Sequence, residues 1–215
     1  MKKNRALVVY VIDASTSMLG RREAVASAVS ESISGYKSSD DETLISIYTF
    51  ASSTKKVLDF VNVNDSPAFE YVVGGMTALY DAIGSVINDI GSKLSGMLED
   101  DRPSSVQIMI ITDGQENSSE DFTSRSVSEM VKHQTEKYSW VFTYLGSNQD
   151  AILAGNNLGI DGNLCATYTD NNFSKTVRSV SAKMNLAKGM DYSSAVQVMA
   201  FSSLERESLV SDDNR

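Results

Sequence analysis

Hydrophobic runs alternate with helical patterns along most of the chain. Residues 7–12 form a continuous apolar run, and residues 106–111 form a second one interrupted only by Gln107; such runs are typical of central strands covered on both faces. The longest helical pattern spans residues 79–98, where hydrophobic residues recur every three to four positions. Further strands are expected at 44–50, 56–63, 140–145 and 165–168, and further helices at 24–33, 122–131, 150–158 and 173–184. This alternation predicts a doubly wound α/β fold, with a mostly parallel sheet and helices on both faces.

One strand of this sheet is expected to be antiparallel and to lie at the edge. Only residues 51–55 separate the strand patterns at 44–50 and 56–63, which is too short for a parallel crossover and fits a hairpin. From about Gly189 the hydrophobic period becomes unclear, and the chain ends in the polar sequence SDDNR. We therefore expect a domain over residues 1–188 and a C-terminal extension over 189–215 that is partly disordered.

The composition is that of an ordinary globular domain with an acidic surface. Of the 215 residues, 41% are hydrophobic and 22% are charged, so a single domain is expected. The formal net charge is −9, from 19 Lys and Arg against 28 Asp and Glu. An acidic chain repels phosphate backbones, so a nucleic-acid partner is not expected.

The same sequence carries no signal for a membrane or an oxidising compartment. No apolar stretch approaches the ~20 residues of a membrane helix, so no membrane partner is expected. The apolar run at 6–12 is short for a signal peptide, ends at Asp13, and fits a first core strand better. The single cysteine, Cys165, has no partner for an intrachain disulfide. We expect a cytoplasmic protein.

Oxygen-bearing side chains follow the two strongest strand patterns and precede the longest helix. Asp13, Ser15 and Ser17 follow the first run in the pattern D-x-S-x-S, Asp113 follows the second run, and Thr77 precedes the helix. Ligands of open parallel sheets gather beyond the carboxyl ends of the strands, so these five side chains are candidates for one site. Each of these residues alone also fits an ordinary structural role, because serine and threonine cap helices and aspartate before glycine is common in turns.

An all-oxygen set indicates a hard divalent cation. Mg²⁺ is the first choice, with Mn²⁺ or Ca²⁺ as alternatives, and the lack of sulfur or imidazole argues against zinc. Two carboxylates and three neutral hydroxyls do not saturate such an ion, so a position remains for an anionic oxygen from a partner. The sequence therefore predicts a metal centre that is open to an incoming carboxylate.

Several neighbours could support this centre or simply be solvated. Asp81 lies one helical turn after Thr77 and could hydrogen-bond to a metal ligand or have an ordinary helix-surface or capping role. Gln115 and Asn117 follow Asp113 and are expected at the rim. Arg21 and Arg22 form the only basic pair near the site, and solvation is their expected role.

Three segments resemble the motif regions of von Willebrand factor A domains. They are VVYVIDASTSM at 8–18, GGMTALYDAI at 74–83 and MIITDGQENSS at 109–119. The resemblance implies a metal-ion-dependent adhesion site in which Asp13, Ser15, Ser17, Thr77 and Asp113 surround the metal, some through water. It also implies a doubly wound, Rossmann-like sheet with one antiparallel edge strand. The segment YLGSNQDAILAGNNLGI at 144–160 looks like bacterial and phage members of the family.

Two classes of function fit these residues. The first is a metal-dependent binding module that coordinates an Asp or Glu side chain of a partner protein. The alternative is a metal-dependent phosphohydrolase, but such enzymes usually carry a second acid two residues after the first, where this chain has Ser15. His133, the single histidine, lies in a polar context and offers no obvious catalytic base. We therefore expect a protein-binding module rather than an enzyme, and the sequence leaves its oligomeric state open.

Overall fold

A mixed sheet organises the molecule. The computed structural model describes residues 2–37, 41–147 and 150–211 of the chain. Within them a six-stranded sheet has the strand order β3-β2-β1-β4-β5-β6, in which only the β2–β3 pair is antiparallel. The expected architecture is confirmed, including the antiparallel edge strand. The strands are β1 Lys2–Asp13, β2 Glu42–Phe50, β3 Thr54–Asn62, β4 Pro103–Thr112, β5 Val141–Ser147 and β6 Cys165–Tyr168.

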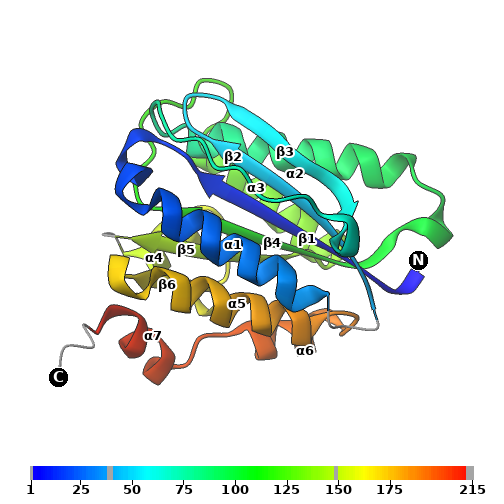
Figure 1. Ribbon diagram of the computed structural model, residues 1–215. Helices are drawn as coiled ribbons and strands as arrows, with labels where there is room; N and C mark the ends of the chain where they lie inside the picture. Colours follow the sequence, from blue (N-terminus) through cyan, green and yellow to red (C-terminus); the bar gives the residue numbers. More distant parts are fainter. Residues whose placement is uncertain (1, 38–40, 148–149, 212–215) are drawn as a thin grey trace.

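Helices cover both faces of the sheet. Helices α1 (Arg22–Tyr36) and α5 (Phe173–Ala187) lie side by side on one face, and α2 (Leu79–Gly96) and α3 (Ser124–Tyr138) lie on the other (Figure 1). Strands β1 and β4 are buried on both sides, which explains why their runs are apolar apart from the buried Gln107 of β4. The Tyr10 hydroxyl of β1 lies 2.5 Å from Ser32 Oγ of α1 and 3.5 Å from Ser181 Oγ of α5, so a buried polar contact joins the three elements.

Shorter helices complete the connections between these elements. The short helix α4 (Ala151–Asn157) lies between β5 and β6 in the chain. The 3₁₀ turns are η1 Thr16–Arg21, η2 Val63–Asp65, η3 Glu99–Asp101, η4 Gly162–Leu164 and η5 Asp170–Asn172. Of these, η1 follows β1 directly and therefore stands at the carboxyl end of the sheet.

The edge strand β3 contains a bulge. Ile45 pairs with Val61 and Ile47 pairs with Leu58, so two residues of β3 face the single residue Ser46. One of the two is Phe60, whose φ of 52° lies in the left-handed region that a bulky residue rarely adopts. Its backbone N–H bonds to Ser46 Oγ at 3.0 Å instead of to a backbone carbonyl of β2. The regular hydrogen-bond ladder is therefore interrupted in the middle of the edge strand.

The C-terminal extension is helical over most of its described length. Helices α6 (Tyr192–Met199) and α7 (Ser203–Val210) begin at the caps Asp191 and Ser202, whose side chains accept backbone N–H groups. The Arg206 guanidinium donates to the carbonyls of Cys165, at 2.5 Å, and Gly162, at 2.8 Å, so α7 is fixed to the edge of β6. The sequence suggested partial disorder here because two eight-residue helices are too short to show a clear period. The last four residues of the expected extension, 212–215, lie outside the described residues.

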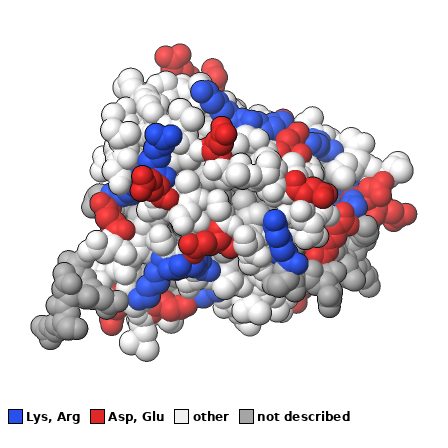
Figure 2. Space-filling model, viewed as in Figure 1, with Lys and Arg blue, Asp and Glu red and all other residues white. Residues whose placement is uncertain are grey.

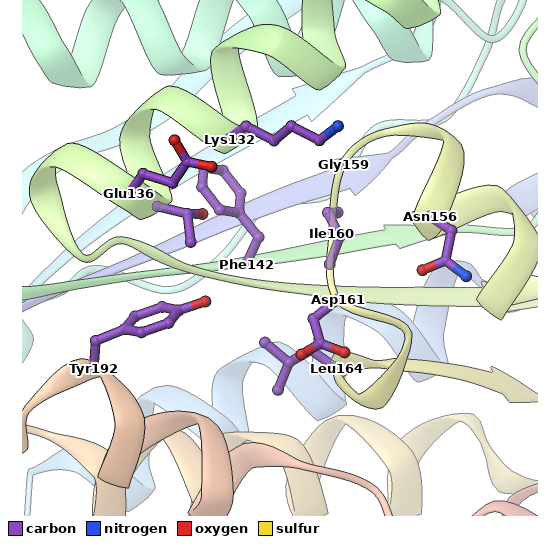
Figure 3. A pocket seen from close by; sticks show the side chains of 10 residues that line it. Lys132, Glu136, Phe142, Asn156, Gly159, Ile160, Asp161, Leu164 and Tyr192 are labelled. Atoms are coloured by element: carbon purple, nitrogen blue, oxygen red, sulfur yellow. The ribbon is translucent and has the colours of Figure 1, made fainter.

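A hollow separates α6 from the end of α3. It has a volume of about 320 Å³, and Tyr192 of α6 points into it towards Asp161, with Lys132 and Glu136 on the opposite wall (Figure 3). Burial, with a smaller contribution from the charge of Asp161, raises the pKa of Tyr192 above its usual value. The hollow lies away from the carboxyl ends of β1 and β4, and its walls carry charges of both signs.

The surface over α1 and α5 carries acidic and basic side chains together. Figure 2 shows Lys and Arg interspersed with Asp and Glu on this face, and Arg178 of α5 pairs with Glu31 of α1 at 2.8 Å. This face offers no continuous basic surface of the kind that binds a phosphate backbone. Among the described helices, none combines the length and the apolar character needed to cross a bilayer.

Candidate metal centre

The carboxyl ends of β1 and β4 bring two separate sequence motifs together. The parallel register pairs Ile12 with Ile111, so Asp13 and Thr112 are the next residues of two adjacent strands. The side chains of both residues are completely buried, and the Thr112 hydroxyl donates to Asp13 Oδ2 at 2.6 Å. Asp113 therefore begins the loop that faces the D-x-S-x-S segment.

Asp13 is held in place by hydrogen bonds as well as by burial. Its Oδ1 accepts the backbone N–H of Ser15 at 2.8 Å, and its Oδ2 accepts the Thr112 hydroxyl. Burial raises the pKa of the Asp13 carboxyl, the negative charge of Asp113 adds to this, and the hydrogen bonds from Ser15 and Thr112 oppose it. A cation placed beside Asp13 and Asp113 would offset the negative charge that acts on the Asp13 carboxyl.

A chain of hydroxyl groups connects the first motif to Asp113. Ser15 Oγ lies 3.0 Å from Ser17 Oγ, and Ser17 Oγ donates to Asp113 Oδ1 at 2.6 Å. Thr77 completes the group, since a Cβ built on Gly114 would lie 3.4 Å from Thr77 Oγ1 and 3.9 Å from Ser17 Oγ. The structure thus brings all five candidate ligand side chains to one end of the sheet.

Backbone contacts fix the two loops that carry the hydroxyls. The backbone N–H of Thr16 donates to the Gly75 carbonyl at 3.0 Å, and the N–H of Gly75 returns a bond to Thr16 Oγ1 at 3.1 Å. Gly75 has a φ of 104°, and a side chain there would meet Ser52 Oγ at 2.9 Å, so glycine is required on both counts. The glycine pair before Thr77 therefore lets its loop lie against the first motif.

Asn117 binds the loop after β4 to the segment just before α2. Asn117 Oδ1 accepts the N–H of Thr77 at 2.9 Å, and the Asn117 N–H donates to the Thr77 carbonyl at 3.1 Å. Asn117 was expected at the rim, and here it holds the backbone of a candidate ligand. Gln115 is exposed.

Asp81 stabilises this loop rather than a ligand side chain. Its carboxylate accepts the backbone N–H groups of residues 120, 121 and 122 at 2.8–3.0 Å. Asp81 therefore holds the loop that precedes α3, whose N-cap is Thr123, and the structure gives it neither a bond to a candidate ligand side chain nor a helix-capping role. Glu116 complements it, because its Oε2 accepts the Tyr80 N–H at 2.9 Å and its Oε1 accepts those of Ser118 and Ser119 at 2.8 and 2.7 Å.

Arg21 lies inside the candidate site, and the expectation that it is simply solvated is wrong. Its side chain is only 11% exposed, and its guanidinium forms ion pairs with Asp113 and Asp170. It also donates to Ser147 Oγ at 3.3 Å. The 3₁₀ turn η1 directs Arg21 back towards Asp113, and nothing in the local sequence signals that turn.

Two tyrosine hydroxyls donate hydrogen bonds to the backbone at the ends of β1 and β4. Tyr71 donates to the carbonyl of Asp13, and Tyr168 donates to the carbonyl of Thr112 at 3.1 Å. These bonds satisfy the two backbone carbonyls directly beneath the cluster, where the strands end. Neither tyrosine belongs to a recognisable motif.

The donor set fits a hard divalent cation. Two carboxylates and three hydroxyls converge from three loops, and all five donors are oxygen. No group of three His, Cys, Asp or Glu side chains that could hold a metal occurs among the described residues, so a cation here would depend on the hydroxyls. Asp13, Ser15, Ser17, Thr77 and Asp113 are the residues that would hold it.

Comparison with known families agrees with the fold and with the positions of these loops. The family model for the von Willebrand factor type A domain matches residues 8–183, from within β1 to within α5. The match covers most of the chain and includes all three loops, and the chain therefore belongs to the von Willebrand factor type A domain family. No curated protein sequence matches the chain.

Solved structures with the same fold come from distant organisms. The proximal thread matrix protein 1 of the mussel byssus, in a form with a zinc-occupied metal-ion-dependent adhesion site (MIDAS) motif, is 16% identical with a TM-score of 0.57, over 85% of this chain and 46% of that one. The ArnB paralog VWA2 from Sulfolobus acidocaldarius is 17% identical with a TM-score of 0.54, over 84% and 45%. A von Willebrand factor type A protein from Catenulispora acidiphila is 13% identical with a TM-score of 0.56, over 83% and 42%. The present chain thus spans less than half of each of these structures.

Proposed function

We propose that this domain binds a partner protein through a divalent cation held by Asp13, Ser15, Ser17, Thr77 and Asp113. The observation that carries the proposal is the convergence of these five oxygen donors at the end of the sheet. When bound, the cation would supply a Lewis-acidic position for an anionic oxygen, here the Asp or Glu side chain of the partner. The mussel structure with zinc in its MIDAS motif supports a divalent ion at this place in the fold. We propose Mg²⁺ as the ion, with Mn²⁺ or Ca²⁺ as alternatives.

The surroundings of the cluster favour a protein as the partner. Leu19 of η1 and Met76 of the glycine loop are exposed apolar side chains on the two loops that carry the hydroxyls. The contact between Thr16 and Gly75 holds these loops together, so both side chains flank the same site. Apolar side chains around a charged centre are typical of a protein-binding surface, where they exclude water from the central contact.

A phosphohydrolase is less well supported by the same geometry. Ser15 stands where a second catalytic acid would be needed, and its hydroxyl contacts Ser17. His133 is exposed on α3 and packs against Tyr138, so it does not reach the cluster.

The buried Cys165, which lacks a second cysteine in the chain, supports our expectation of a reducing, cytoplasmic compartment.

Calorimetric titration with Mg²⁺, Mn²⁺ and Ca²⁺ tests the cation site. We expect Asp13→Asn to weaken the affinity at least tenfold, because the amide keeps the volume but loses the charge. Asn is preferable to Ala, since Asp13 is buried and Ala would leave the Thr112 hydroxyl without its acceptor. Asp89→Asn, on the exposed side of α2, removes the same charge and is expected to leave the affinity unchanged. Equal affinities for wild type and Asp13→Asn would contradict the proposed site.

A further inference from the structure

A hollow opens beside the cluster and shares Gly114 with it. Its volume is about 430 Å³, within the ~300–1,000 Å³ that is usual for ligand pockets. Three segments form it: the start of α2, the loop after β4, and α4. The lining residues include Leu79, Gly114, Tyr144, Leu153, Ala154 and Leu158.

Gly114 connects this hollow with the candidate metal centre. Gly114 lines the hollow. A Cβ atom at this position would lie 3.4 Å from Thr77 Oγ1 and 3.9 Å from Ser17 Oγ. Leu79 lies two residues after Thr77 and is buried in the wall. A partner segment with its carboxylate at the centre would therefore pass over the mouth of the hollow.

The hollow is suited to an apolar side chain. Leu79, Tyr144 and Leu158 are buried beneath it, whereas Leu153 is 59% exposed at its edge. The two acidic residues at the rim already have partners, since Glu116 accepts the N–H of Tyr80 at the start of α2 and Asp150 accepts those of Ile152 and Leu153. Their charges are thus used within the fold. Leu153 supplies the exposed apolar surface of the hollow, and Gln115 and Asn157 are exposed polar residues of its lining.

We infer that the partner carries a large apolar side chain, of the size of Leu, Met or Phe, within two residues of the carboxylate that reaches the metal. The inference rests on the proposed function, because the carboxylate sets the position of the partner segment. The hollow then distinguishes one acidic segment from another. Removing the apolar side chain from the partner should weaken binding about tenfold or more, as expected for loss of a buried Leu or Phe.

Selection from a displayed peptide library tests this directly. The library has one fixed Asp with three randomised residues on each side, and it is selected on the full chain in Mn²⁺ and in EDTA. We expect peptides that bind only in Mn²⁺ and that are enriched in Leu, Met or Phe at one position near the Asp. A synthetic peptide from the selected set should bind about tenfold more weakly after Leu→Ala at that position, and should lose binding after Asp→Asn.

Two variants of the protein assign the apolar preference to the hollow. Leu153→Lys should abolish the difference between the Leu and Ala peptides and leave Mn²⁺ affinity unchanged. Leu186→Lys is the matched control, because Leu186 is 66% exposed on α5, which covers the opposite face of the sheet. It should retain the full difference between the peptides.

The outcomes separate this inference from the proposed function. Metal-dependent peptides that require Asp but show no apolar preference would overturn the inference and leave the proposed function standing. The same follows from an apolar preference that survives in Leu153→Lys. A library that gives no metal-dependent binders would overturn both.

Discussion

Arg21 places a permanent positive charge beside the carboxylate that is expected to face the cation. Its guanidinium pairs with Asp113, whose side chain is almost completely buried, and with Asp170 on η5. The arginine therefore neutralises a buried carboxylate, and the same charge opposes a second cation nearby. We therefore expect Arg21 to stabilise the metal-free fold and to lower the affinity of the proposed site for a cation.

We predict that Arg21→Ala tightens Mg²⁺ binding about fivefold, which corresponds to roughly 1 kcal/mol of removed repulsion. The same variant should lower the free energy of unfolding in EDTA by about 1–3 kcal/mol, because it leaves Asp113 with an unpaired buried charge. Calorimetric titration and urea unfolding measure the two effects.

Arg178→Ala is the control for this prediction. It removes the same charge from an exposed ion pair with Glu31 and should change neither quantity appreciably. Weaker Mg²⁺ binding in Arg21→Ala would show instead that Arg21 orients Asp113 for the metal, and would contradict the predicted repulsion between Arg21 and the cation.

At the scale of elements, the loop after β4 and the first turn of α2 form one unit. Glu116 joins them through the backbone N–H groups of Tyr80, Ser118 and Ser119 and through the Ser119 hydroxyl. Burial alone would raise the pKa of Glu116, but these hydrogen bonds outweigh it and lower the pKa below its usual 4.5. The charged form is thus the one that stabilises the fold.

The pH dependence follows from the direction of this shift. The stabilisation by Glu116 is fully present above the unfolded pKa near 4.5 and is lost as the pH falls through the lower pKa of the folded state. We predict that Glu116→Gln lowers the free energy of unfolding by about 1–2 kcal/mol at pH 7. The difference from wild type should shrink below pH ~4, as urea unfolding at several pH values would show.

Glu120→Gln serves as the control on the same loop. Glu120 is exposed, and only its backbone N–H takes part in holding the loop, through Asp81. A pH-independent difference between Glu116→Gln and wild type would mean that packing, and not the charge, is the contribution of Glu116.

The elements themselves could be predicted from the sequence, whereas the contacts between loops could not. The apolar runs that became β1 and β4 and the long pattern of α2 are repeated signals over many residues, so single exceptions do not obscure them. The five candidate ligands stand at the ends of these elements, and their positions follow from strand order alone. Arg21 and Asp113 are 92 residues apart, and Asn117 and Thr77 are 40 apart, so their pairing depends on how two loops meet. Two eight-residue helices, α6 and α7, gave no clear period, although their caps Asp191 and Ser202 are readable in retrospect.

At the scale of the molecule, the C-terminal extension is part of the folded domain. Phe201, between α6 and α7, is buried, and its N–H donates to the Asn163 carbonyl at 2.9 Å. The Lys183 ammonium lies 5.0 Å from the centre of its ring, which adds a cation–π contact. The extension therefore contributes to the core next to α5 and β6, beyond the residues matched by the family model.

We predict that Phe201→Ala lowers the free energy of unfolding by about 3–5 kcal/mol, the range for truncation of a buried phenylalanine. Leu204→Ala, three residues away and exposed, should have an effect near zero. Urea unfolding measures the free energy of unfolding of both variants, and an unchanged m-value would show that the difference is one of stability. Equal effects would show that the extension is not packed cooperatively with the domain.

The two edges of the sheet also determine how crowded copies of this protein behave. A bare strand edge can template further strands, and growth from such edges is a common route to polymerisation. At β3 the bulge at Phe60 breaks the repeat that an added strand would need to follow. At β6 only four residues form the edge, and Arg206 already occupies the carbonyl of Cys165. Both features oppose growth of the sheet from its edges, so we expect crowded copies of the domain to stay separate.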